Sequence, residues 1–185
     1  MQENIALVQN GFRILLPDMA GYICRELSRV YKNSWWQEVL TALSDQYDLP
    51  SSGEYAELQD SLDVANCLRL IDRRWNDVFR SKLSKDYRTW ATELMGVRNK
   101  VAHLGMQDIA QADAERALDT MARLCDGFDS DGAEEIRALY RKLRYGSEDA
   151  STSSAPAKET TPTGKSKTVA AVLGRHVGEN LPSWR

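Results

Sequence analysis

The sequence predicts an all-α helical bundle. Apolar residues recur every three to four positions through most of residues 1–146, no apolar/polar alternation persists over a strand length, and β-branched residues do not cluster. With 185 residues, the chain can build one domain with a real core but not two ordinary ones. We therefore expect a bundle of about five to seven helices.

The N-terminal part of the bundle is predicted from apolar spacing. Apolar residues from Ile5 to Leu16 follow a helical rhythm. Pro17 then stands where the first turn of a second helix, over residues 19–31, would tolerate it. We expect this proline to separate two helices.

Two adjacent tryptophans open the next predicted helix. Ser34 offers its N-cap, and Trp35 and Trp36 follow. Neighbouring side chains on a helix point about 100° apart, so one tryptophan is expected to leave the core and mark an interface. The stretch 45–60, which contains Pro50 and Gly53, is typical of a loop.

The centre of the chain predicts an antiparallel helical hairpin. Ser61 is expected to cap a helix that runs to Phe79, and Ser84 a helix that ends near Gly105. The connection between them is so short that the two helices must lie antiparallel. Trp75 and Trp90 are expected to be core partners within it. Two further helices are predicted, over 109–128 and after Asp131-Gly132.

The composition changes near residue 146. Residues 147–168 contain no aromatic and no large aliphatic side chain, and such a segment cannot offset its ordering entropy. The sequence therefore predicts a helical domain over 1–146, a disordered linker over 147–168, and the start of a following domain or a truncated stub over 169–185.

Charge and cysteine usage exclude several classes of protein. A net charge of −3 argues against a protein that coats nucleic acid by bulk electrostatics. Residues 69–100 nevertheless hold nine basic and four acidic side chains, which fits a solvated helix face. The cysteines Cys24, Cys67 and Cys125 lack CxxC spacing and are expected to be reduced core residues. No apolar run or signal-like N-terminus predicts a membrane span or export, so a cytoplasmic protein is expected.

One cluster of residues can carry chemistry. Arg98, Asn99 and His103 lie within six positions at the end of a predicted helix. An Arg fork binds phosphate, and an imidazole transfers protons near neutral pH. On an ideal helix Asn99 and His103 share a face and Arg98 lies about 100° from Asn99, so all three converge only if the helix end loosens or a second copy completes the site. The alternative from the residues alone is a helix-terminal cap. No metal-ligand spacing or nucleotide-binding motif accompanies the cluster, so neither a metal nor a cofactor is expected.

The segment Arg98-Asn99-Lys100-Val101-Ala102-His103 resembles the Arg, polar residue, three residues, His motif of the HEPN superfamily. A helix containing Trp75, a short turn, and the segment Tyr87-Arg88-Thr89-Trp90 precede it, as in the Swt-like branch of that superfamily. That branch is found at the front of large bacterial ATPases of anti-phage systems. The resemblance covers about residues 15–145. The closing Leu181-Pro182-Ser183-Trp184-Arg185 is similar to the segment that opens those ATPases.

The resemblance implies a metal-independent endoribonuclease that leaves a cyclic phosphate and a 5′-hydroxyl. His103 would be the acid/base, Arg98 would stabilise the phosphate, and Asn99 would orient the site. The implied partners are RNA (tRNA is one candidate), a second copy that binds through the motif helix, and a C-terminal ATPase region of a longer chain. The basic window would then face RNA, with Arg73, Arg74 and Lys100 as candidate phosphate contacts. Asp72 is a candidate partner for Arg98 or Arg73 across the hairpin.

Two other functions fit the same residues. A non-catalytic dimerisation or sensing module could use the exposed tryptophan as its partner surface. A sequence-specific DNA reader is less well supported, because the hairpin helices are too long and too antiparallel for one of them to enter a major groove.

Overall fold

The computed structural model describes residues 3–45, 48–104, 107–128 and 131–146, and those ranges contain α-helices and no strand. The helices are α1 (Glu3–Tyr31), α2 (Trp35–Ala42), α3 (Tyr55–Asp60), α4 (Val64–Arg73), α5 (Lys85–His103), α6 (Gln111–Asp126) and α7 (Gly132–Tyr145). The predicted all-α bundle is confirmed. Gly105, the expected linker over 147–168, and residues 169–185 lie outside the described residues.

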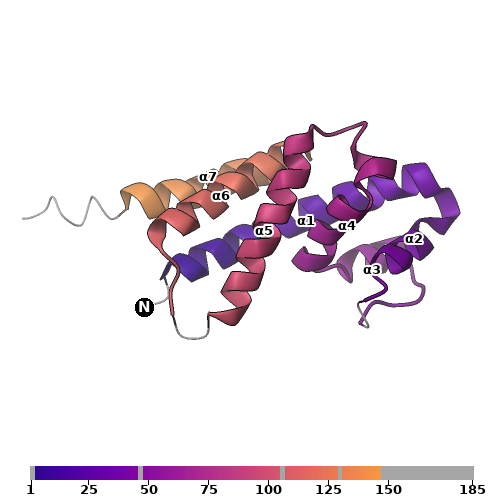
Figure 1. Cartoon of the computed structure of the whole chain (residues 1–185), viewed down its shortest axis with the longest axis horizontal. Coiled ribbons are helices and arrows are strands. Elements are labelled where there is room, and N and C mark those ends of the chain that lie inside the picture. The colour runs from indigo at the N-terminus through magenta and orange to yellow at the C-terminus, as the bar shows by residue number, and fades with distance from the viewer. Residues whose placement is uncertain (1–2, 46–47, 105–106, 129–130, 147–185) are drawn as a thin grey trace, which may run out of the picture. The chain divides into compact units, whose positions relative to one another are not determined.

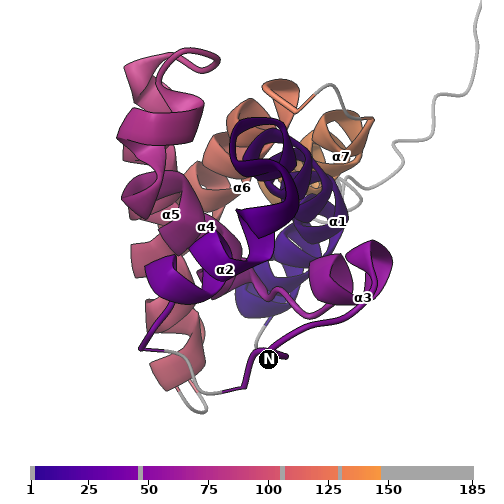
Figure 2. The ribbon, with the colours of Figure 1, turned by 90° about the vertical axis from the view of Figure 1, so that its right-hand side faces the viewer.

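Helix α1 is the centre of the bundle (Figures 1 and 2). It packs against α2, α3 and α4 and also against α6 and α7, with α6 and α7 along one side and α4 along another. Its core-facing side chains are fully buried, and each contributes on the order of 2 kcal/mol to stability. They follow the helical period: Val8, Leu15, Met19, Ile23 and Leu27.

Pro17 does not separate two helices, contrary to the prediction. α1 runs unbroken from Glu3 to Tyr31 with Pro17 inside it. A proline in a helix interior removes one backbone hydrogen bond and costs about 3 kcal/mol. The buried face on both sides of Pro17 offsets that cost, because Leu15 and Met19 are both completely buried.

Both tryptophans at the start of α2 are buried, so the prediction that one leaves the core is wrong. Trp35 and Trp36 are 9% and 5% exposed. The Trp36 indole N–H donates to the Pro50 carbonyl at 2.8 Å, and the ring of Trp35 lies 5.2 Å from that of Tyr55. The segment expected to be a loop folds over them and contains α3. The two rings meet edge-on with centroids 5.4 Å apart, and this segment contacts both of them.

The central hairpin is antiparallel, as predicted, although its details differ. Its first helix, α4, is capped by Asp63 rather than Ser61 and gives way to a π-helical turn at Trp75–Phe79. α5 starts after Ser84 as expected. Trp75 is buried, but no ring contact joins it to Trp90 among the described residues. Trp90 instead packs edge-on against Tyr87, with ring centroids 4.9 Å apart.

The register of the hairpin corrects the expected partner of Asp72. Its carboxylate accepts a hydrogen bond from Arg88 at 2.7 Å, not from Arg98 or Arg73. Near the other end of the hairpin, Asp63 lies opposite Arg98. A connection this short sets Asp72 against the beginning of α5 and Arg98 against the beginning of α4.

The three cysteines are buried and form no disulfide, which confirms their expected place in the core. Burial raises the pKa of the Cys24 thiol to about 12 and that of Cys67 well above its ordinary value. Such thiols are poor nucleophiles. Within the described ranges, no helix has the length and apolar character needed to cross a membrane.

Candidate functional site

The motif residues occupy the C-terminal end of α5. The α-helix continues through His103, and Leu104 is its C-cap, so the helix end does not loosen within the motif. Asn99 and His103 are exposed, whereas Arg98 is half-buried. Five helical positions turn the direction of a side chain by about 140°, so Arg98 and His103 project from different sides of α5.

Arg98 faces α4. Its Nη2 atom lies 3.7 Å from the Asp63 carboxylate and its Nη1 atom lies 3.5 Å from the Asn99 Oδ1 atom. The other carboxylate oxygen of Asp63 accepts the backbone N–H of Asn66 at 2.7 Å and caps α4. One aspartate therefore fixes the start of α4 and also holds the motif arginine beside it. A groove of about 330 Å³, with Phe12 on its wall, opens next to this arginine.

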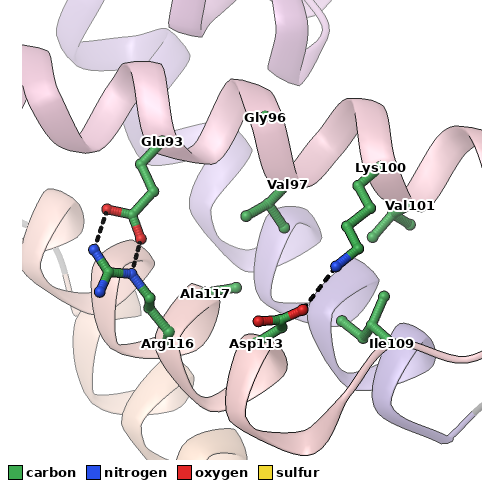
Figure 3. Close-up of a pocket in the computed structure, with 9 residues that line it drawn as sticks. All are labelled: Glu93, Gly96, Val97, Lys100, Val101, Ile109, Asp113, Arg116 and Ala117. Atoms are coloured by element: carbon green, nitrogen blue, oxygen red, sulfur yellow. Dashed lines mark hydrogen bonds and ion pairs between the residues drawn. The ribbon is translucent and has the colours of Figure 1, made fainter.

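The opposite side of α5 faces α6 across a second groove, of about 300 Å³ (Figure 3). Lys100 donates to Asp113 at 2.7 Å, and Arg116 donates to both carboxylate oxygens of Glu93 at 2.6 and 3.1 Å. The hydrogen bond from Arg116 holds the pKa of the Glu93 carboxyl below its ordinary value, although partial burial opposes this shift. Two ion pairs thus bridge α5 and α6 over a floor that includes Val97 and Ala117.

The chain beyond the motif is tied to the start of α1. The Asp108 carboxylate accepts the backbone N–H groups of Asn4 at 3.1 Å and Ile5 at 2.9 Å. Desolvation alone would raise the pKa of Asp108, but these hydrogen bonds outweigh it and hold the pKa below its ordinary value. The Asn4 amide also donates to the carbonyl of Ile109 at 2.8 Å. The described segment that begins at Gln107 is therefore anchored to the start of α1.

Arg73 and Arg74 lie apart from the motif. Arg73 donates to the Asp45 carboxylate at 2.7 Å, and Arg74 forms an ion pair with Glu38 at 2.7 Å with only 15% of its side chain exposed. The preceding residue, Asp72, meets α5 at Arg88, which is about 15 Å along the helix from Arg98. Of the three candidate phosphate contacts, only Lys100 belongs to the motif end of α5.

The acids that hold the motif were not identified from the sequence. Asp63 and Asp113 come from two other helices, and each meets a basic residue of the motif segment. An aspartate directly before the apolar start of a helix is a standard N-cap signal, and it could have identified Asp63 as the cap of α4. Nothing in the sequence pairs that cap with Arg98, because the pairing depends on the hairpin register.

The exposed face of α5 carries a stripe of small and polar residues, which we call the α5 seam. Its members recur at alternating intervals of three and four positions, the spacing at which one helix meets another. None of them is buried by the described part of the chain, and a Cβ added at its glycine would meet nothing within 4 Å. The seam consists of Thr89, Thr92, Gly96, Asn99 and His103.

The donor set suits a phosphodiester. A guanidinium stabilises charge on phosphate oxygens, an imidazole transfers a proton, and an amide orients either group or a ribose hydroxyl. Two of the three side chains, Asn99 and His103, lie on the α5 seam. Among the described residues, no group of three or more His, Cys, Asp or Glu side chains is arranged to hold a metal ion.

Comparison with known proteins identifies the family. No curated protein and no solved structure matches the chain. The family model described as Swt1-like HEPN matches residues 10–129, which include most of α1, the hairpin, the motif and α6. The match covers well over half of the chain and confirms the resemblance seen in the motif and its flanking helices. The chain therefore belongs to the Swt1-like HEPN family, whose domains are of ribonuclease or nucleotide-related type.

Proposed function

We propose that this domain is a metal-independent endoribonuclease that acts as a homodimer through the end of α5. The observation that carries the proposal is the motif itself: Arg98, Asn99 and His103 stand at the end of an intact helix, and none of them is buried. Family membership supports a ribonuclease-type module in general. The choice of RNA cleavage over another nucleotide-related role rests on the chemistry of these three side chains.

The proposed reaction is an internal transfer at phosphorus. The imidazole of His103 takes the proton from a ribose 2′-hydroxyl, whose oxygen then attacks the adjacent phosphate. The 2′-oxygen to phosphorus bond forms, the bond from phosphorus to the 5′-oxygen breaks, and the leaving oxygen takes the proton that His103 accepted, which restores the neutral imidazole. The products are a 2′,3′-cyclic phosphate and a 5′-hydroxyl. Arg98 stabilises the negative charge that develops on the phosphate oxygens, and Asn99 orients the site.

A second copy of the chain would bring together an Arg98 and a His103 that a single α5 helix holds apart. Because α5 stays helical through His103, Arg98 and His103 of one chain project about 140° apart. Two α5 helices that cross along their seams would place His103 of one copy near Arg98 of the other. The small side chains of the α5 seam and the open space at Gly96 support a close crossing of this kind.

The experiment is an RNA cleavage assay in EDTA on total tRNA and on a mixed-sequence RNA. The wild-type chain is expected to leave 2′,3′-cyclic phosphate ends, and His103→Ala and Arg98→Ala are expected to abolish cleavage while circular dichroism remains helical. The second histidine of the chain gives a matched control, because His176→Ala should cleave like the wild type. Cleavage that persists in both motif variants would remove the proposed site.

The alternative is a non-catalytic dimerisation or sensing module. The partner surface expected for such a module was an exposed tryptophan, but Trp35 and Trp36 are both buried. The α5 seam would serve it equally well. A dimer that cleaves no RNA in the same assay would favour this alternative. In either case we place the domain in a bacterial anti-phage protein whose ATPase region follows it, as the motif resemblance implies.

A further inference from the structure

The basic window of the sequence divides into two groups in the structure. Five of its nine basic side chains form ion pairs with acidic residues on other segments of the chain. They are Arg73, Arg74, Arg88, Arg98 and Lys100. Three others follow one another where the hairpin turns into α5 and, among the described residues, form no ion pair: Arg80, Lys82 and Lys85. The ninth, Arg69 of α4, interacts electrostatically with Asp45. The uncommitted positive charge of the window is therefore at the hairpin turn and not at the motif.

The hairpin turn borders a hollow of about 730 Å³ between the end of α1, the start of α5 and the end of α6. We call it the hairpin-turn hollow. Arg25 and Arg29 of α1 line it together with Lys82. The wall also includes Asp126, an acid that is already paired with Arg137. The chain as a whole is acidic, so this concentration of positive charge is local.

A buried acid organises the two arginines. Glu26 lines the hollow with only 5% of its side chain exposed. Its carboxylate accepts a hydrogen bond from Arg29 at 2.6 Å and lies 3.7 Å from Nε of Arg25. A carboxylate so deeply buried is costly unless it is paired, so Glu26 fixes the positions of both guanidinium groups. The remaining N–H donors of the two forks are not used by this contact.

The rest of the wall suits a nucleic acid. α5 begins at the hollow with Ser84 as its N-cap, and that side chain makes no capping hydrogen bond. The positive end of the helix dipole favours a phosphate here, and Asp86 in the first turn partly offsets it. Tyr87 contributes a half-buried ring, which is where a single-stranded base can stack. Gly127 allows this ring to approach, because a Cβ there would lie 2.2 Å from Tyr87 Cε1.

We propose that the hairpin-turn hollow binds the phosphate backbone of single-stranded RNA through Arg25, Arg29 and Lys82. The inference rests on the proposed function only in taking RNA as the ligand. The hollow and the motif stand at opposite ends of α5, about 28 Å apart along the helix. An RNA held at both places would span about eight stacked nucleotides, at about 3.4 Å for each. RNA shorter than that should be cleaved poorly even where it contains the scissile site.

The test measures RNA binding separately from cleavage. The full chain carrying His103→Ala, which should not degrade its ligand, is titrated against a fluorescein-labelled mixed-sequence single-stranded RNA by anisotropy over a range of KCl concentrations. Lys82→Glu is the main variant because Lys82 is exposed and forms no ion pair among the described residues, so its change should leave the fold intact. Removal of one phosphate-binding cation should lower the salt slope by about 0.7 and weaken binding about fivefold at about 0.1 M salt.

The matched control is Lys142→Glu. Lys142 is an exposed lysine in the last turn of α7, which lies beside the start of α6, whereas the hollow lies at the end of α6. The control should bind RNA like the parent chain. Arg29→Gln, checked for an unchanged melting temperature, should weaken binding as Lys82→Glu does.

Several results overturn the inference. These are binding that neither Lys82→Glu nor Arg29→Gln weakens, equal weakening by Lys142→Glu, no RNA binding by the parent chain, or polyglutamate that competes as well as unlabelled RNA. The two proposals fail separately. If the wild type cleaves RNA but Lys82→Glu does not weaken RNA binding, the proposed RNA-binding role of the hollow is wrong and the proposed nuclease still stands. If Lys82→Glu weakens RNA binding but the wild type cleaves no RNA, the proposed nuclease is wrong and the proposed RNA-binding role of the hollow still stands.

Discussion

Asp63 shows how one side chain can serve the fold and the site at once. One of its oxygens caps α4 through the N–H of Asn66, and the other lies 3.7 Å from Arg98. Both partners of the ion pair are more than a third exposed, so the attraction is screened and contributes little to stability. We therefore assign the stability to the cap and the position of the Arg98 guanidinium to the ion pair.

This division can be tested with two substitutions. Asp63→Ala removes the cap and should lower the free energy of unfolding by about 1 kcal/mol, whereas Asp63→Asn keeps a capping oxygen and should lower it far less. Urea unfolding followed by circular dichroism measures both. Equal losses in the two variants would mean that the charge, and not the cap, stabilises α4.

At the same scale, the motif residues were found from the sequence and their partners were not. Arg98, Asn99 and His103 are close in sequence, so a local pattern reveals them. Asp63 and Asp113 reach the motif segment only after α4 and α6 have packed beside α5. The burial of both Trp35 and Trp36 likewise depends on a segment that local pattern assigned to a loop.

Among the elements, α5 is the least covered. Only Ala91 and Leu94 of its nineteen residues are buried, whereas eight of the sixteen residues of α6 are buried, among them Ala117 and Leu118. A helix with so little buried surface in one chain retains a face for another partner. The sequence predicted this helix well because its cap and period agree. It predicted α1 less well, because tertiary packing overrides the local signal of Pro17.

Substitutions at Gly96 test separately how stable α5 is and whether it forms the dimer interface. A Cβ at Gly96 meets nothing within 4 Å, so Gly96→Ala should stabilise the single chain by up to about 1 kcal/mol. Leucine, like alanine, favours a helix more than glycine does. Gly96→Leu also places a large side chain on the α5 seam, so it should weaken the dimer. Thermal melting at low concentration and sedimentation equilibrium give the two quantities. A Gly96→Leu dimer as tight as the wild type would place the interface on another face.

The link between α5 and α6 should depend on pH. Arg116 holds the pKa of Glu93 below its ordinary value of 4.5 in the folded chain. The stabilisation is therefore fully present above pH 4.5 and is lost as the pH falls through the lower, folded pKa. Glu93→Gln should lower stability by no more than about 1 kcal/mol at about pH 7, because Arg116 is largely exposed. The difference between variant and wild type should shrink toward zero as the pH falls below 4.5 and through the lower, folded pKa, in melts recorded across that range. If the difference in stability between Glu93→Gln and the wild type does not change with pH, the effect of the substitution comes from packing and not from the charge of Glu93.

For the whole molecule, the central claim is that each cleavage site combines Arg98 of one copy with His103 of the other, so that a dimer has two such sites. A single chain presents Arg98 and His103 on different sides of α5, and the α5 seam is left open by the rest of the described bundle. The same arrangement leaves the hairpin-turn hollow at the far end of each α5, so a dimer would have two RNA-binding ends flanking a shared centre. The divergence of Arg98 and His103 follows from helical spacing and was predicted from the sequence, whereas the hollow depends on how α1 and α6 pack beside α5 and was not.

The most direct test mixes two inactive variants. Arg98→Ala and His103→Ala chains are each expected to cleave no RNA alone. After exchange at equal concentrations, about half of the dimers should be mixed, and each mixed dimer keeps one site with Arg98 from one copy and His103 from the other. We predict that RNA cleavage in EDTA then recovers to about a quarter of the wild-type rate. A mixture as inactive as either variant alone would contradict the shared site.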